Sequence, residues 1–166
     1  MLIAHLAPGF AAAIASQQYW DSGWGLRKRT GLWVAALGST FIPDLDVIYN
    51  VLVTGIFNHR TLYTHSVFVH GTIALIWMVL VLVGRWRYGA ILAGLAAAGG
   101  FSHLILDMIA HNTPLFYPVS MQMVGIAPER VVEGGIVAYL THPVVLLEPL
   151  LIVSVWFYAH RVRQNG

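Results

Sequence analysis

The sequence predicts an all-helical membrane protein, a multi-pass bundle of about five transmembrane segments that forms one domain over residues 1–166. Three observations predict this class. Of the 166 residues, 58% are hydrophobic and only 10% are charged, whereas soluble domains carry about 25% charged residues. The mean hydropathy is +0.71. The apolar residues also gather in runs as long as a bilayer is thick, which disfavours an unusually apolar soluble bundle.

The apolar runs give the order of the elements. Each has roughly the 17–25 residues that a transmembrane helix needs, and they cover residues 2–20, 31–53, 65–84, 88–110 and 142–158. The first run is interrupted by Pro8 and Gly9. Because it lacks a positively charged start, we expect it to stay in the mature protein rather than be cleaved as a signal. The connection 112–141 is rich in proline and glycine, which predicts an outer loop rather than one continuous helix.

The basic residues set the expected orientation in the membrane. Seven of the nine lysines and arginines lie in three clusters between or after the apolar runs, namely Arg27, Lys28, Arg29, Arg85, Arg87, Arg161 and Arg163. Positively charged loops stay in the cytoplasm. For a protein with five spans in the cell (inner) membrane, this places the N-terminus on the extracytoplasmic side and the C-terminus in the cytoplasm. This clustering explains the sequence pI near 9.2 without a nucleic-acid partner.

Ionisable residues inside the apolar runs and their outer loops share one depth. Such residues are costly in a bilayer, and by default they indicate function. With the orientation taken from the basic loops alone, seven of the eight histidines fall on the outer side. The outer group is His5, Asp44, Asp46, His59, Arg60, His65, His70, His103, Asp107, His111, His142 and Glu148. Polar residues that each formed separate hydrogen bonds would not need to lie at the same depth in the membrane. We therefore expect these residues to form one site at the extracytoplasmic face.

His103 and Asp107 carry the clearest metal-binding pattern. Spaced i, i+4, they project from one helix face, and imidazole with carboxylate suits zinc or a similar divalent ion. Asp44 and Asp46 follow Pro43, which interrupts regular helix geometry. A broken helix is tolerated in a membrane where it lines a protein cavity, so either aspartate can be a ligand, while a merely polar kink is the alternative. The chain has no cysteine, which excludes thiolate ligands and disulfides.

The connection before the third run adds further candidates. Either His59 or His65 can ligate a metal from this position. Arg60 can hold an anionic group, because a guanidinium matches phosphate oxygens bidentately, or it can serve only as an interface anchor. Further metal ligands or supporting residues are His70, His111, His142 and Glu148.

Four motifs in chain order resemble the YdjM-like membrane-bound metal-dependent hydrolases of bacterial and archaeal membranes. They are Ala-His-Leu at 4–6, Ile-Pro-Asp-Leu-Asp at 42–46, His-Arg with Thr-His-Ser within 59–66, and Phe-Ser-His-Leu-Ile-Leu-Asp at 101–107 followed by Pro-Leu-Phe-Tyr-Pro at 114–118. Val47 stands where the family usually has a histidine. The resemblance implies a membrane-bound hydrolase that depends on metal.

The order of these histidines and aspartates is also similar to the zinc-dependent phospholipase C and single-strand nuclease group. Those enzymes are all-helical, and their zinc cluster hydrolyses phosphoesters. The similarity implies two or three zinc ions as the cofactor. By this resemblance the metal ligands are His5, one of Asp44 and Asp46, one of His59 and His65, His103 and Asp107.

We therefore predict a hydrolase that uses metal-activated water on a phosphoester of a lipid or lipid-linked molecule. A carboxylate of Asp44 or Asp46 can orient the water or take its proton, and Arg60 can hold the phosphate. Three alternatives stay open: a metal-dependent lipid amidase, a divalent-cation or proton transporter, and a metal with a purely structural role. A transporter needs polar groups along a path to both faces, and the apolar inner half of each run disfavours it.

Overall fold

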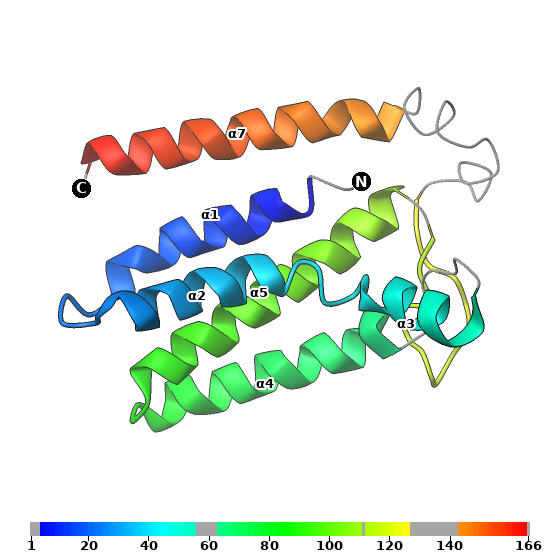
Figure 1. The fold of residues 1–166 in the computed structure, drawn as a ribbon, viewed down its shortest axis with the longest axis horizontal. Helices are drawn as coiled ribbons and strands as arrows, with labels where there is room; N and C mark the ends of the chain where they lie inside the picture. Colours follow the sequence, from blue (N-terminus) through cyan, green and yellow to red (C-terminus); the bar gives the residue numbers. More distant parts are fainter. Residues whose placement is uncertain (1–3, 56–62, 111, 127–142, 166) are drawn as a thin grey trace.

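A computed structural model describes residues 4–55, 63–110, 112–126 and 143–165. Within these ranges the chain is helical, and its only β-pairing is an isolated bridge between Thr113 and Val124, so the predicted all-helical class is confirmed. Figure 1 shows the long helices running roughly along one axis. The elements are α1 Leu6–Ser16, η1 Gln17–Tyr19, α2 Leu26–Gly38, α3 Leu45–Thr54, η2 Tyr63–His65, α4 Val67–Val83, α5 Arg87–Ala110 and α7 Pro143–Asn165.

Helix α5 is the centre of the bundle, and it packs against α1, α2 and α4. Small residues make this close approach possible. A Cβ at Gly99 would overlap the Ser39 side chain, and a Cβ at Gly100 would overlap the ring of His70. These glycines therefore let two polar side chains from neighbouring elements approach the α5 backbone, as small residues do at helix contacts in membranes.

Four of the predicted apolar runs correspond to one helix each, with shifted ends. Helix α1 begins at Leu6, later than the predicted run. Ser66 is the N-cap of α4, and its hydroxyl accepts a hydrogen bond from the amide of Phe68 at 3.2 Å, which is one of the roles expected of a serine at this position. Helix α7 continues past the predicted end to Asn165. Apolarity therefore located these helices, whereas capping and packing decide where they end.

The second predicted run is divided into α2 and α3 by a turn. Pro43 lies in this turn, where its ring interrupts helix geometry as the sequence predicts. The hydroxyls of Ser39 and Thr40 each donate to a carbonyl of α2, at 3.2 and 2.7 Å, so they close α2 rather than cap α3. The turn leaves Asp44 at the N-cap position of α3 without a capping bond from its side chain.

Large apolar side chains remain on the surface of the bundle. Along α4, Leu75, Ile76, Val79 and Leu82 are all exposed, Leu82 by 78%. An apolar patch of this extent is rare on water-facing proteins. Of the helices in the described ranges, α5 alone has both the length, 24 residues, and the mean hydropathy, 1.7, to cross a bilayer. The membrane character is thus supported by one helix, and the number of five spans stays a prediction.

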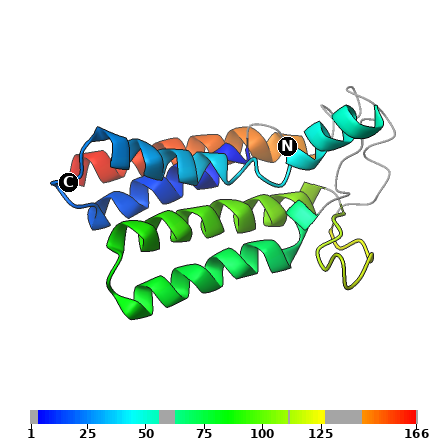
Figure 2. The same ribbon diagram turned by 60° about the horizontal axis from the view of Figure 1, so that its bottom comes forward.

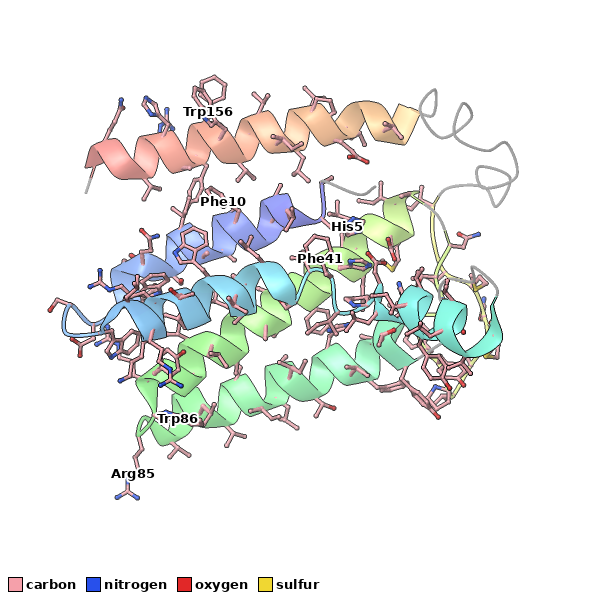
Figure 3. All side chains as sticks on the ribbon, in the orientation of Figure 1. His5, Phe10, Phe41, Arg85, Trp86 and Trp156 are labelled. Atoms are coloured by element: carbon pink, nitrogen blue, oxygen red, sulfur yellow. The ribbon has the colours of Figure 1, made fainter. Side chains whose placement is uncertain are left out.

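The two ends of the bundle differ in chemistry. At one end lie the α1–α2 connection, the α4–α5 turn and the end of α7 (Figures 1 and 2), and these segments carry the three basic clusters. Figure 3 places Arg85 and Trp86 at this basic end and His5 toward the other, which we call the histidine end. A small apolar core of Ala13, Leu32, Ala36 and Leu95 joins α1, α2 and α5.

Candidate metal centre

Six ionisable side chains meet at the histidine end from four separate parts of the chain. The turn before α1 supplies one histidine, the start of α3 two aspartates, η2 one histidine, and α5 a histidine and an aspartate. Two sets of three place donor atoms within 4.8 Å of one another, and both sets include His103. We call the group the His–Asp cluster; its members are His5, Asp44, Asp46, His65, His103 and Asp107.

Helix α5 supplies the base of the cluster. His103 and Asp107 are one helical turn apart, and their Nε2 and Oδ2 atoms lie 3.3 Å from each other, so the i, i+4 prediction of a shared face is confirmed. The Nδ1 of His103 donates to the carbonyl oxygen of Thr40 at 2.6 Å. Its Nε2 faces Asp44 Oδ1 at 3.4 Å. The turn between α2 and α3 thus orients this ring and brings a carboxylate to its other nitrogen.

His65 lies between three carboxylates. Its Nε2 is 3.3 Å from Asp107 Oδ2 and 3.9 Å from Asp44 Oδ1. Its Nδ1 is 3.4 Å from Asp46 Oδ2, on the side away from the other members. The short η2 helix directly before α4 brings this ring into the cluster. The two aspartates of α3 therefore differ in position, because Asp44 faces the inner nitrogen of His65 and Asp46 faces the outer one.

His5 closes the remaining side. Its Nε2 is 3.2 Å from Asp107 Oδ1, and its ring centroid is 4.1 Å from that of His103. The two oxygens of Asp107 consequently point to different partners: Oδ1 faces His5, and Oδ2 faces His65 and His103. Each oxygen of Asp107 therefore lies beside a histidine nitrogen, so either oxygen could serve as a metal ligand.

Burial of these charged side chains is energetically unfavourable unless a cation lies among them. The side chains of five members are at most 4% exposed, and only that of Asp44 is open to its surroundings, at 39%. Buried carboxylates cost several kcal/mol each unless opposite charge and hydrogen bonds offset this. Three ionised carboxylates beside three neutral imidazoles carry three negative charges, so protons, metal ions or both have to supply three positive charges to reach neutrality.

The two ring nitrogens of His103 show whether this cation can be a metal. A carbonyl oxygen only accepts, so the bond to Thr40 fixes the ring proton on Nδ1. The buried Nε2 faces two carboxylate oxygens, and no hydrogen-bond partner for it exists within the described ranges, so either a second proton or a metal ion has to stand between these atoms. A metal ion satisfies all three atoms. Histidines that ligate metal commonly place the other nitrogen on a backbone carbonyl or a carboxylate. His103 does so with Thr40, and Nδ1 of His65 lies 3.4 Å from Asp46 Oδ2.

The donor types fit zinc or a related divalent ion. Zinc takes imidazole nitrogen and carboxylate oxygen at four positions, and the inner face of the cluster offers His5, His65 and His103 nitrogens with Asp44 and Asp107 oxygens. The donors are sufficient for one ion, and Asp107 can extend them to a second. The arrangement can therefore hold a metal beside the partly exposed carboxylate of Asp44.

The other predicted site residues divide into two groups. His70 is buried, but its Nε2 donates to the carbonyl of Thr64 at 2.9 Å, and Glu148 lies on α7; neither belongs to a donor set. Four predicted residues lie outside the described part of the chain, so their positions stay predictions: His59, Arg60, His111 and His142.

Sequence reasoning missed one residue that contacts the cluster and one buried polar residue close to it in the chain. Thr40 acts through its backbone carbonyl, which leaves no mark in a sequence. Asn50 is buried on α3, one turn after Asp46. A polar residue four positions from an aspartate in an apolar helix is a readable signal, because the two share a face.

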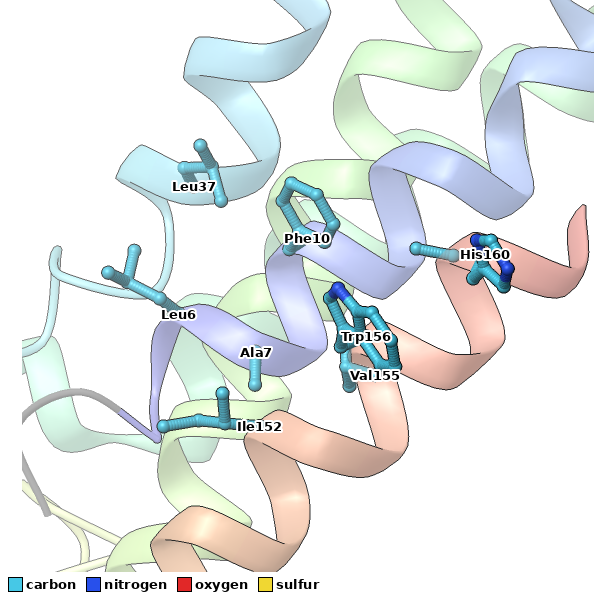
Figure 4. Close-up of a pocket in the computed structure, with 9 residues that line it drawn as sticks. Leu6, Ala7, Phe10, Leu37, Ile152, Val155, Trp156 and His160 are labelled. Carbon is cyan, nitrogen blue, oxygen red and sulfur yellow. The ribbon is translucent and has the colours of Figure 1, made fainter. Parts of the chain in front are cut away.

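An apolar cavity of about 430 Å³ lies apart from these donors, between α1, α2 and α7 (Figure 4). Among the side chains that line it are Phe10, Leu37, Ile152 and Trp156, and His160 is its one titratable group. This lining has no carboxylate and no pair of donors. Of these two places, the His–Asp cluster is therefore the one that gathers several groups able to bind a metal.

Comparison with known proteins agrees with a membrane setting. The model of a family described as YdjM inner membrane protein matches residues 1–164. No curated protein and no solved structure shows significant similarity. The family description names a membrane and gives no activity, so function has to be argued from the His–Asp cluster.

Proposed function

This chain belongs to the YdjM inner membrane protein family, and we propose that it is a metal-dependent hydrolase whose centre is the His–Asp cluster. One observation carries the proposal: three histidines and three aspartates converge from four segments, and five of the six are almost fully buried. Helix packing alone does not require three carboxylates in one buried place, where their desolvation is costly. A centre that binds cations does.

We propose further that the chain crosses the inner membrane about five times, with the cluster near the outer face. Family membership and α5 support a membrane setting. The three basic connections lie at one end of the bundle and the cluster lies at the other (Figures 1 and 3). If the basic end is cytoplasmic, as the positive-inside rule predicts, the N-terminus and the cluster face the outside.

In this proposal His5, His65, His103, Asp44 and Asp107 hold one or two zinc ions, while Asp46 and Thr40 orient the rings of His65 and His103. The 3.4 Å approach of Asp46 to the outer nitrogen of His65 supports that division of roles. A bound divalent ion supplies Lewis acidity and makes water acidic enough to react near neutral pH. A third ion, as the wider resemblance implies, would need ligands from beyond the described ranges.

The reaction we propose is the attack of water on a phosphoester. Asp44 is the exposed member of the cluster, so water and substrate meet the cluster there. Its second carboxylate oxygen can accept the proton of the attacking water while the new phosphorus–oxygen bond forms. The phosphorus–oxygen bond to the leaving group breaks, and the proton that Asp44 accepted passes to the leaving oxygen, which departs as an alcohol. Arg60 would hold the phosphate from its loop. A membrane setting favours a lipid or lipid-linked substrate.

The first experiment measures metal content and hydrolysis together. Wild-type protein and Asp107→Ala are purified in detergent, and elemental analysis counts bound zinc, manganese and magnesium. We expect one or more zinc equivalents in the wild type and at most traces in Asp107→Ala. We also expect the wild type, and not Asp107→Ala, to cleave one phosphoester bond of a phospholipid in mixed micelles, which releases an alcohol and a phosphomonoester. Asp21→Ala is the matched control, because Asp21 is exposed at the basic end.

The possible outcomes separate the alternatives. Metal without any hydrolysis of phosphoesters, but with hydrolysis of a lipid amide, would replace the phosphoesterase by an amidase. Metal with neither activity would leave a structural role. Failure of wild-type protein to bind any divalent metal after reconstitution would overturn the proposal as a whole.

A further inference from the structure

Helix α3 carries Asp46 of the cluster and begins directly after Asp44, yet most of its surface is apolar and exposed. Asp46 and Asn50 are buried on one face. Around the rest of the helix, Ile48, Leu52 and Val53 are exposed by 56%, 79% and 61%. Its one charged side chain is the buried Asp46. Such a surface is unfavourable in water, where each exposed leucine or isoleucine forgoes about 1.5–3 kcal/mol.

The length of α3 decides how it can meet a membrane. Ten residues rise about 15 Å, roughly half of the hydrocarbon thickness of about 30 Å. The helix ends at Gly55 in a left-handed conformation. It projects from the histidine end of the bundle in both views (Figures 1 and 2). The polar face of α3 is turned into the protein, so the helix presents apolar surface outward at the end of the bundle, and it is too short to span a bilayer.

The same apolar surface surrounds the opening of the cluster. Asp44 is its exposed member. Residues on either side of it in the chain, Phe41, Ile42 and Leu45, are also exposed, by 41%, 37% and 49%. A water-soluble, highly charged substrate gains nothing from such a rim. A molecule with an alkyl chain beside its reactive headgroup gains from burial against it.

We infer that α3 is an interfacial helix, and that it docks a lipid so that the headgroup reaches Asp44. The occupant is an amphiphile from the outer leaflet: its chains lie against Phe41, Ile42 and Leu45, and α3 holds the opening at headgroup depth. This inference rests on the proposed function for the identity of the reacting centre, whereas the contact of α3 with lipid can be measured without any activity.

Because the chain has no cysteine, a fluorophore reacts only at a cysteine that is introduced by substitution. Single cysteines at Ile48 and Leu52 are labelled with an environment-sensitive fluorophore in phospholipid vesicles. The control is Gln122→Cys, which replaces an exposed polar side chain outside the helices. We expect blue-shifted emission at both α3 positions, with stronger quenching by lipids that carry nitroxide near the headgroup than by lipids that carry it at the chain end. Iodide should quench the Gln122 label and spare the other two.

Three results would overturn the inference. Strongest quenching by the chain-end nitroxide would make α3 part of a span, and quenching by iodide alone would place it in water. Blue-shifted emission that no lipid nitroxide quenches would indicate a protein partner on this surface. None of these readings requires turnover, so they stand even if the proposed hydrolysis fails.

A second measurement links docking to substrate choice. The quantity measured is the rate of hydrolysis of phospholipid in vesicles divided by the rate with a short water-soluble phosphodiester. We expect this ratio to be about tenfold lower in Leu45→Asn than in wild type, because the variant loses the burial of one leucine side chain against the lipid. Metal content, measured in parallel, should stay at the wild-type value. An unchanged ratio in active protein would show that the rim does not select lipid, whereas no hydrolysis of either substrate by the wild type would count against the proposed function instead.

Discussion

The basic end and the histidine end of this bundle are stabilised in opposite ways. Near the basic end, alanine and leucine side chains such as Ala13, Leu32 and Leu95 fill a small core. Side-chain hydrogen bonds there, such as that between Trp20 and Ser16, join residues close in the chain. At the histidine end the interior is ionisable, and its contacts join residues far apart in the chain. The first arrangement needs only apolar burial, whereas the second is favourable only when charge is balanced.

This difference separates folding from function within one small chain. Loss of packing at the basic end should cost stability and leave the metal in place. Loss of a donor at the histidine end should remove the metal while the helices stay assembled. The predictions below test that separation, beginning with the largest expected effect.

The largest effect should follow from replacing His103, because both donor sets include it. Loss of an outer-shell partner typically costs 10–100-fold in metal affinity, and loss of a shared ligand should exceed the upper value. We expect His103→Ala to bind zinc at least about 100-fold more weakly than wild type. Competition with a coloured chelator measures the affinity, and circular dichroism checks that the helices persist.

The counterpart at the basic end is Leu32→Ala. Leu32 is fully buried in the apolar core, so its truncation should lower the free energy of unfolding by about 2–5 kcal/mol with unchanged zinc stoichiometry below the unfolding transition. If Leu32→Ala in its folded form emptied the centre as completely as His103→Ala, the two ends would not be separable.

How much of this centre is readable from sequence depends on how each residue is positioned. His103 and Asp107 lie in one continuous helix, so a periodicity of 3.6 residues was enough to place them on one face. The runs of apolar residues likewise located α1, α4, α5 and α7. Sequence periodicity therefore predicts the position of a side chain where the geometry of a single helix determines it.

The choice between Asp44 and Asp46 could not be made in the same way. Both follow Pro43, and the direction of each carboxylate depends on how the turn between α2 and α3 packs against α5. The approach of His5 to Asp107 spans 102 positions and depends on the close contact of α1 with α5. The carbonyl of Thr40 has no signature in a side chain. These are tertiary facts, which no local pattern encodes.

Replacing Asp46 should have a smaller effect on zinc affinity, and it distinguishes the role of Asp46 from that of Asp44. We expect Asp46→Asn to weaken zinc binding by about 10–100-fold, the usual effect of losing the partner that orients a ligating histidine, and to recover full stoichiometry when zinc is raised. Titration with zinc against a chelator gives both quantities, and Asp21→Asn is the control. If Asp46→Asn stayed empty at every zinc concentration, Asp46 would be a direct ligand.

The smallest effect should come from His70, which supports the cluster from one step further away. Its ring lies against Gly100, where no Cβ would fit, and its Nε2 holds the carbonyl of Thr64, next to His65. A buried hydrogen bond contributes about 0.5–1.5 kcal/mol, so His70→Leu should weaken zinc binding by about 2–10-fold without changing the number of ions.

A conservative replacement distinguishes this positioning role from simple filling of space. The side-chain amide of His70→Gln can donate to the same carbonyl, so it should restore most of the affinity that His70→Leu loses, although neither residue matches the ring in shape. Restoration by glutamine would mean that the hydrogen bond to Thr64 keeps η2, and with it His65, in place. Equal losses in both variants would mean that the packing of the ring against α5 matters and the bond does not. The precision of the histidine end would then derive from the small residues of α5, which admit the ring, rather than from a second layer of polar contacts.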